Sequence, residues 1–110
     1  MPTARMRRVN EVIREILGVA IATELKDPRI GFVTVTDVDT SPDLRASRVF
    51  VSVLGSEEDR ERTLEGLNSS HGYLQSRIND ELRMKRTPTL TFHYDESIER
   101  ATRISRLLDD

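Results

Sequence analysis

The chain contains no cysteine and no tryptophan, and only 5% of its 110 residues are aromatic. Without cysteine, a disulfide framework, a thiolate zinc site and a cysteine nucleophile are all excluded. No apolar run approaches the roughly 20 residues needed to span a membrane, and residues 1–8 lack the apolar stretch of a signal peptide. The sequence therefore predicts a soluble cytoplasmic protein, a single domain over residues 1–110, with a core of valine, isoleucine and leucine.

Recognisable catalytic and cofactor motifs are also missing. The glycines fit neither the dinucleotide fingerprint nor the P-loop, and the two histidines have no HExxH-type partner. Ser69-Ser70-His71 lacks a nucleophile elbow, and neighbouring residues seldom reach the geometry of a nucleophile and its base. We therefore expect no catalytic residue, no metal site, no cofactor and no enzymatic activity.

Charge is unevenly distributed along the chain, although its net value is only −2. Residues 1–8 contain Arg5, Arg7 and Arg8 without an acid, and residues 82–94 contain three further cations without an acid. Residues 57–61 are strongly acidic in contrast. Because phosphate binding depends on where charge lies rather than on its sum, two basic segments are candidates for contact with nucleic acid.

Hydrophobic periodicity predicts an α-β-β-α-α-β-α order. The expected elements are a helix over 4–25, strands over 32–38 and 44–54 joined by a turn at 40–43, helices between 57 and 84, a strand over 89–94 and a helix over 96–108. A slip in the apolar phase between Val35 and Val38 indicates a bulge or an early strand end. Thr3 is a plausible N-cap without a glutamate to complete a capping box.

Gly72 interrupts the helical stripe between 57 and 84, because glycine is unfavourable inside a helix. The segment therefore reads as two helices that meet at a kink or tight turn. Such a junction lets the backbone approach a partner, and the second helix offers N-terminal amide groups to phosphate. The alternative is that Gly72 only caps a helix and that the basic residues after it are merely solvated.

The α-β-β-α-α-β order resembles that of type II KH domains, although their GXXG loop is absent. Ser70-His71-Gly72 in its place resembles the kink of the ribosome-binding factor A family. Further similarity lies in the basic start, in residues 26–31, in residues 41–46 leading into 49–53, and in residues 88–98. The resemblance implies an α+β fold: one KH-like domain with a kink between two helices, a C-terminal helix and a three-stranded sheet covered by helices.

For function, the resemblance implies a bacterial assembly factor that binds the free 30S ribosomal subunit and assists late maturation of 16S rRNA. It also implies a role in cold adaptation, release by a partner GTPase, no catalytic activity, and a monomer away from the ribosome. Two departures limit the transfer. Gln75 stands where relatives often carry a basic residue, and the sequence stops at Asp110 without the charged tail of many relatives.

Two functional hypotheses remain. The first is an RNA-binding ribosome assembly factor, in which cations neutralise phosphates and the kink sets the approach of the backbone. Its candidate RNA-binding residues are Arg5, Arg7, Arg8, Arg29, Arg45, Ser70, His71, Gly72, Arg77, Arg83, Lys85 and Arg86. The second is a protein-interaction adaptor whose acidic helix, residues 57–65, docks a basic partner. Steep salt dependence of binding to bare rRNA would favour the first hypothesis.

Overall fold

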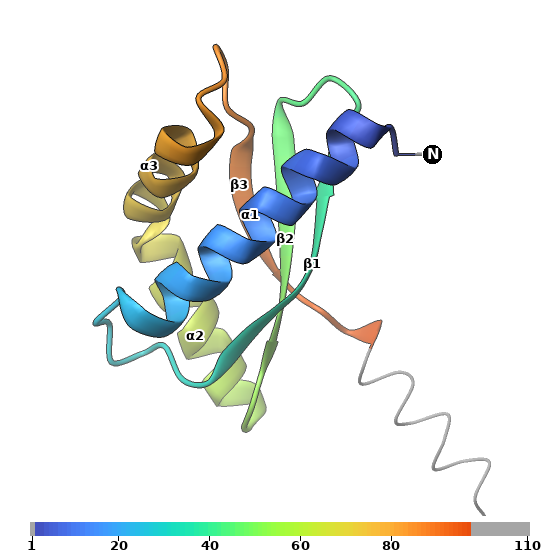
Figure 1. The fold of residues 1–110 in the computed structure, drawn as a ribbon. Coiled ribbons are helices and arrows are strands. Elements are labelled where there is room, and N and C mark those ends of the chain that lie inside the picture. The colour runs from blue at the N-terminus through green and yellow to red at the C-terminus, as the bar shows by residue number, and fades with distance from the viewer. Residues whose placement is uncertain (1, 98–110) are drawn as a thin grey trace, which may run out of the picture.

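Three helices and three strands make up the fold in a computed structural model that describes residues 2–97. The elements are α1 (Ala4–Thr23), β1 (Val33–Thr40), β2 (Ala46–Val53), α2 (Glu57–Ser69), α3 (His71–Leu82) and β3 (Thr89–Tyr94). The predicted α-β-β-α-α-β order is confirmed (Figure 1). The last predicted helix, over 96–108, lies outside the described residues apart from its first two positions.

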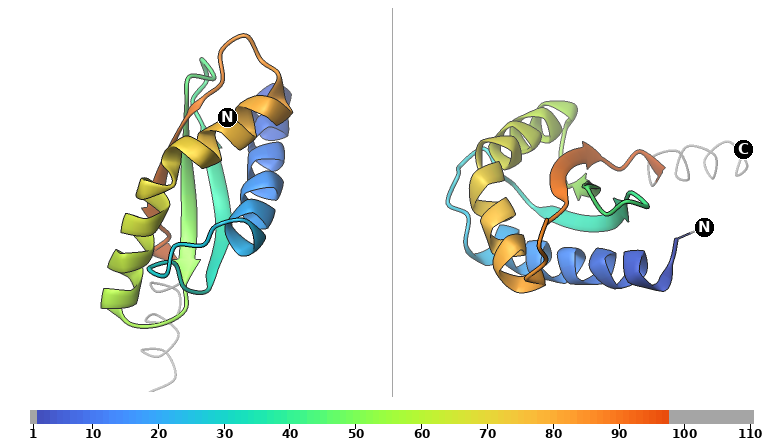
Figure 2. Two further views of the ribbon diagram at one scale, coloured as in Figure 1. Left: turned by 90° about the vertical axis from the view of Figure 1, so that its left-hand side faces the viewer. Right: turned by 90° about the horizontal axis from the view of Figure 1, so that it is seen from above.

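The sheet has the order β1-β2-β3, with β1 antiparallel and β3 parallel to the central β2. A parallel neighbour requires a crossover connection, and the α2–α3 pair supplies it. The helices wrap around one side of the curved sheet: α1 packs on β1, and α2 and α3 pack beside β3 (Figure 2). The opposite side of the sheet carries exposed polar residues such as Arg48 and Thr91.

The core is aliphatic, as the composition predicted. One cluster joins the inner faces of all six elements, and its members with no exposed surface are Ile13, Leu17, Ala20, Val49, Val51, Leu67, Leu74 and Ile78. Strand β3 alternates, because Leu90 and Phe92 are buried, Thr91 and His93 are exposed, and Tyr94 is half-buried. This packing fixes the helix pair α2–α3 against the sheet.

The phase slip in the first strand marks a bulge between Val35 and Asp37. Of the two predicted alternatives, the bulge is therefore correct, and β1 continues past it to Thr40. The predictions that the strand ends at 38 and that a turn begins at Thr40 were wrong. The Thr40 hydroxyl is buried, where it contacts the Ser47 hydroxyl at 2.7 Å and donates to the Asn10 side chain. A buried polar pair broke the apolar pattern from which the strand end was predicted.

The second strand begins two residues later than predicted. Leu44 has a φ of 60°, which is left-handed backbone and cannot continue a strand, and Arg45 precedes the first strand residue as an exposed side chain. The prediction that Arg45 lies in the strand was therefore wrong. At the start of α1, Thr3 does form a capping box, because its own N–H donates to the Met6 sulfur at 3.4 Å.

Candidate nucleic-acid interface

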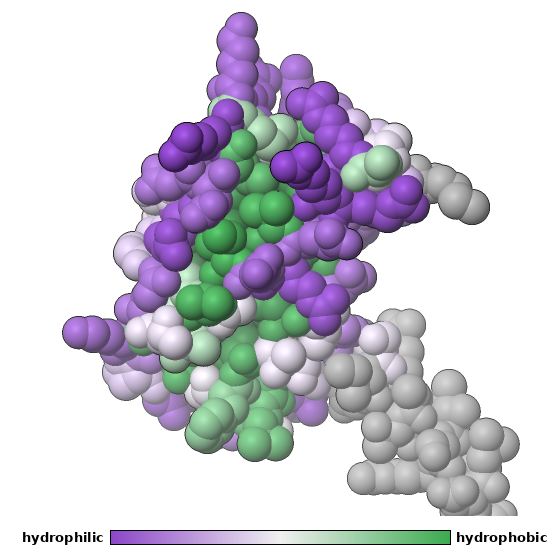
Figure 3. Space-filling model, viewed as in Figure 1, coloured by the Kyte–Doolittle hydropathy of each residue, from purple (hydrophilic) through white to green (hydrophobic). Residues whose placement is uncertain are grey.

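Six cations gather at one end of the molecule although they come from three separate segments. We call this surface the basic end; it comprises Arg5 and Arg8 on α1, Arg45 in the β1–β2 turn, and Arg83, Lys85 and Arg86 between α3 and β3. All six are exposed. Five of them line one surface pocket of about 450 Å³, and Arg8 lines an adjoining pocket that shares Arg5 with the first. Hydrophilic side chains crowd this end in Figure 3.

The acidic residue in that pocket is already engaged locally. Asp43 accepts hydrogen bonds from the Ser41 hydroxyl at 2.6 Å and from the Arg45 backbone N–H at 3.1 Å. These bonds, the Ser41 contact foremost, lower the pKa of Asp43, so the carboxylate stays charged and shapes the turn. Five cations against one carboxylate leave the pocket strongly positive, and this is the electrostatic requirement for binding phosphate.

Two residues in left-handed conformation shape the connections at the basic end. Leu44 turns the β1–β2 connection, and Arg83, with φ 49° and ψ 36°, ends α3. A non-glycine residue in this region costs on the order of 1 kcal/mol. Strain of this kind persists where surrounding structure enforces it, and it often accompanies binding sites. Both turns direct their basic neighbours toward the same end of the fold.

The kink lies at Ser70, two residues before Gly72. The Ser70 N–H donates to the carbonyl of Gly66 at 3.0 Å and to that of Leu67 at 3.1 Å, and its own carbonyl accepts from Leu74 at 3.0 Å. Gly72 is exposed, has no positive φ, and would bring an added Cβ near no other atom. A Cβ at this position would therefore be accommodated in the free protein, and the backbone stays accessible to a partner.

His71 turns toward the sheet. Its Nε2 donates to the carbonyl of Leu90 at 2.8 Å, because a carbonyl can only accept, and its ring meets Phe92 edge-on. One helical turn later, Gln75 Oε1 accepts from the Leu90 N–H at 2.9 Å and Gln75 Nε2 donates to the Pro88 carbonyl at 2.8 Å. The pair satisfies backbone groups along β3, which lies at an edge of the sheet.

These hydrogen bonds to β3 account for a glutamine at position 75, where relatives often carry a basic residue. Lysine and arginine carry no hydrogen-bond acceptor, so neither could receive the Leu90 N–H that Gln75 receives. No sequence pattern indicated this role, because it depends on which strand lies at the edge of the sheet. His71 and Gln75 are thus fixed by the fold, whereas Gly72 and the large Tyr73 side chain next to the kink are exposed.

Two predicted arginines are paired with acids. Arg77 contacts Glu24 through Nε at 2.9 Å and through a second guanidinium nitrogen at 3.2 Å, and the Tyr73 hydroxyl donates to the same carboxylate. The Tyr73 and Arg77 bonds lower the pKa of Glu24, and the Glu24 contact raises the pKa of Tyr73. This cluster ties α3 to the end of α1. Because the Glu24 carboxylate offsets the positive charge of Arg77, the pair attracts phosphate less than a free arginine would.

Arg29 is the second paired arginine. Its guanidinium meets Asp27 with contacts of 2.7–3.2 Å, and this side-chain contact lowers the pKa of Asp27 to about 2. The same loop is held against α2, because the Thr63 hydroxyl lies 3.4 Å from both the Arg29 carbonyl and the Gly31 nitrogen. Arg29 lies on the loop after α1, far from the basic end (Figure 1).

The remaining predicted cation, Arg7, is exposed on α1.

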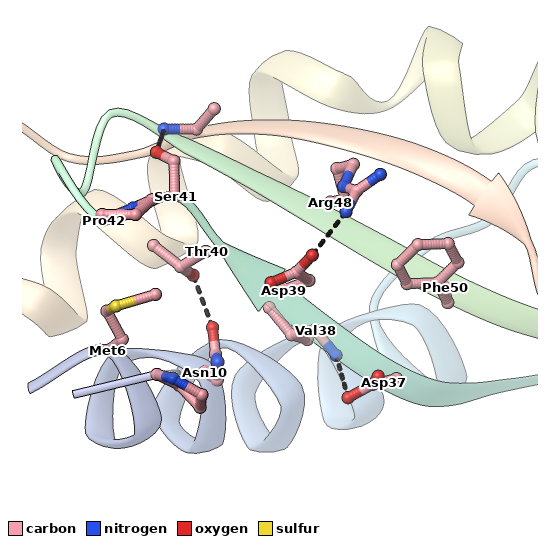
Figure 4. A pocket seen from close by; sticks show the side chains of 12 residues that line it. Met6, Asn10, Asp37, Val38, Asp39, Thr40, Ser41, Pro42, Arg48 and Phe50 are labelled. Carbon is pink, nitrogen blue, oxygen red and sulfur yellow. Dashed lines mark hydrogen bonds and ion pairs between the residues drawn. The ribbon is translucent and has the colours of Figure 1, made fainter. Parts of the chain in front are cut away.

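A surface hollow of about 830 Å³ lies between the start of α1 and the strands β1 and β2 (Figure 4). Its charged groups are Asp37, Asp39 and Arg48, of which the last two form an ion pair across the strands. No group of three or more histidine, cysteine or acidic residues that could hold a metal occurs within residues 2–97. In the same residues, no helix is long and apolar enough to cross a membrane.

The fold, with its paired α2 and α3, parallel β3 and one covered sheet side, is that of a type II KH-like domain. A profile of the family Ribosome-binding factor A matches residues 5–108. Ribosome-binding factor A of Halothermothrix orenii is 44% identical over 108 residues, which cover 98% of this chain and 88% of that protein. The chain belongs to the ribosome-binding factor A family.

Solved structures agree with this assignment. The solution structure of a Thermotoga maritima ribosome binding factor A matches with a TM-score of 0.77 and 35% identity, covering 90% of this chain and 94% of that one. The crystal structure of ribosome-binding factor A from Thermus thermophilus matches with a TM-score of 0.74 and 26% identity, covering 84% and 97%. Thermus thermophilus coordinates fitted into the cryo-EM map of a 30S complex match with a TM-score of 0.64 and 28% identity, covering 79% and 91%.

Proposed function

We propose that the protein binds the small ribosomal subunit, holds phosphates of 16S rRNA at its basic end, and thereby assists late maturation of that RNA. The observation that carries the proposal is the convergence of six exposed cations from three segments onto one end of a fold whose Thermus thermophilus relative was placed in a 30S complex. Cations brought together in this way neutralise adjacent phosphates, which favours RNA over a protein partner at this surface.

The candidate cations differ in whether an acidic side chain of the protein already pairs with them. The basic end supplies phosphate contacts, whereas Arg29 and Arg77 act first in ion pairs with Asp27 and Glu24. The kink supplies the second element, because a backbone without a Cβ at Gly72 allows RNA to approach α3 closely. On this proposal the protein acts by binding and not by catalysis, and a GTPase could release it by competing for the subunit.

Salt dependence of binding tests the assignment of the surface. Neutralising Arg83, Lys85 or Arg86 to glutamine should weaken binding to 16S rRNA and reduce the slope of log K against log salt by about 0.7–0.9 for each phosphate that is no longer neutralised. Arg14→Gln and Arg62→Gln are matched controls, because both residues are exposed arginines outside the basic end. Equal reductions in both sets would refute the proposed interface.

Sedimentation tests the proposed partner. The protein should travel with free small subunits and far less with complete ribosomes. Equal occupancy of both pools would contradict a role in assembly, even if the salt experiment had located an RNA-binding surface. Purified protein should hydrolyse neither RNA nor nucleoside triphosphates, and turnover abolished by a single substitution would show an enzyme instead.

A further inference from the structure

The end of the sheet opposite the basic end carries two large, exposed apolar side chains. Phe32 is 81% exposed and Leu54 is 76% exposed, and the Leu54 N–H donates to the Phe32 carbonyl at 3.1 Å. They therefore project from neighbouring positions, where β1 begins and β2 ends. Figure 3 shows apolar surface at this end of the molecule. We call Phe32 and Leu54 the apolar tip.

Neither residue is needed for the fold. The core already contains Val33 and Val53 from the adjacent positions of the same strands, whereas the apolar tip points into solvent. Leaving two such side chains in water forfeits the free energy that their burial would contribute. A contiguous exposed apolar surface commonly marks a site where another molecule docks.

Charge beside the apolar tip indicates the chemistry of the occupant. Leu54 and Gly55 lead directly into α2, whose first turn holds Glu57, Glu58 and Asp59. Asp59 lies against Gly55, since an added Cβ on Gly55 would come within 2.3 Å of its carboxylate. Carboxylates at this end repel the phosphates of RNA, so the apolar tip faces a different kind of partner from the basic end.

We propose that the apolar tip docks a lysine- and arginine-rich segment of a protein of the small subunit, with an apolar side chain of that segment packed between Phe32 and Leu54. This inference rests on the proposed binding to the small subunit. The cations of the segment would lie against the first turn of α2, and the apolar contact would supply the affinity. The two ends of the molecule would then read different components of one particle, RNA at one end and protein at the other.

The test compares two ligands: purified small subunits and protein-free 16S rRNA. Phe32→Ser with Leu54→Ser should weaken binding to small subunits by about 10- to 100-fold, as expected when both side chains lose part of the free energy of full burial. Binding to protein-free 16S rRNA should stay unchanged. The Val19→Ser variant, which removes a 54% exposed side chain from α1, is the matched control and should change neither affinity.

Unchanged binding to subunits, or an equal loss for both ligands, would overturn the proposal. Because both side chains are exposed, the unfolding midpoint should be retained, and Leu54→Ser alone permits the same comparison if the double variant folds poorly. A photo-crosslinking p-benzoylphenylalanine in place of Phe32 should join to lysine- and arginine-rich protein peptides on purified subunits. Crosslinks to rRNA, or to a second copy of this chain, would refute a protein occupant. If the basic-end variants left salt-dependent RNA binding unchanged, that result would refute the proposed RNA interface at the basic end and would not bear on the apolar tip.

Discussion

Gly66 and Gly72 lie six residues apart on the same helix pair, yet adding one methyl group to each should have opposite effects. An ideal Cβ on Gly66 would lie 2.6 Å from Cγ1 and 3.3 Å from Cδ1 of Ile30, and 3.5 Å from the Cβ of Arg29. One on Gly72 would meet nothing within 4 Å. The structure thus provides a paired test of how closely α2 packs on the loop after α1.

The magnitudes follow from these contacts. Gly72→Ala should stabilise the protein by about 0.5–1 kcal/mol, the usual difference between alanine and glycine within a helix. Gly66→Ala gains a similar helical preference but forces Ile30 aside, which costs about 1–3 kcal/mol for overpacking. The two variants should therefore differ by about 1–3 kcal/mol, or several degrees in melting temperature for a domain of this size.

Chemical denaturation and thermal melting of both variants measure this difference. If Gly72→Ala destabilised the protein as much as Gly66→Ala, the inference that a Cβ at position 72 meets no other atom would be refuted. The same position then reports on function. The Cβ of Gly72→Val would meet no other atom within 4 Å. A loss of RNA binding at retained stability would therefore show that RNA approaches the backbone there, whereas unchanged binding would leave the kink a purely structural feature.

Three other predictions concern stability. Gln75→Ala should destabilise the fold by about 1–3 kcal/mol, because the Leu90 N–H on β3 loses its acceptor; an unchanged denaturation midpoint would contradict this. Thr40→Val should cost about 1–3 kcal/mol by leaving buried hydroxyl and amide partners unpaired, measured in the same way. Asp27 has a folded pKa of about 2 against an ordinary 3.8, so its stabilising pairing with Arg29 is present above pH 4 and is lost as pH falls toward 2. Asp27→Asn should flatten the dependence of unfolding free energy on pH across that window.

The sequence predicted the order of elements, the core and the two basic segments, because each depends on local patterns. The buried residues Leu74 and Ile78 stand at helical spacing in the sequence, and the buried residues Leu90 and Phe92 stand at strand alternation. The phase slip after Val35 correctly indicated a bulge. Pattern also showed that the chain lacks a GXXG loop, and comparison with relatives then established the family.

What the sequence could not show was which arginines are paired. Glu24 and Arg77 are separated by 53 positions, and only the packing of α3 beside α1 brings them together. The grip of His71 and Gln75 on β3 was hidden for the same reason, since no pattern reveals the strand order. Asp27, by contrast, stands two residues from Arg29, and that short spacing is a signal in the sequence from which this pair can be predicted.

The left-handed backbone at the basic end could not be predicted either. Glycine is the residue that usually indicates this conformation, and neither of the two positions that adopt it there is a glycine. Arg83 adopts a φ of 49° at the end of α3, a position where glycine is the common choice. An arginine there carries a conformational cost that a glycine would not, on the order of 1 kcal/mol. If the Arg83 side chain contacts phosphate, the RNA binding that it contributes offsets the conformational cost of its left-handed backbone.

Two substitutions separate the cost from the benefit. Arg83→Gly and Arg83→Ala remove the same charge, but only glycine relieves the left-handed backbone, so Arg83→Gly should be more stable than Arg83→Ala by about 1 kcal/mol. Both should weaken binding to 16S rRNA equally, with equal reductions in salt slope. Denaturation and salt-dependent titration of the pair measure both effects. Wild-type affinity in Arg83→Gly would mean that the residue serves only to end α3, and the basic end would then rest on its five remaining cations.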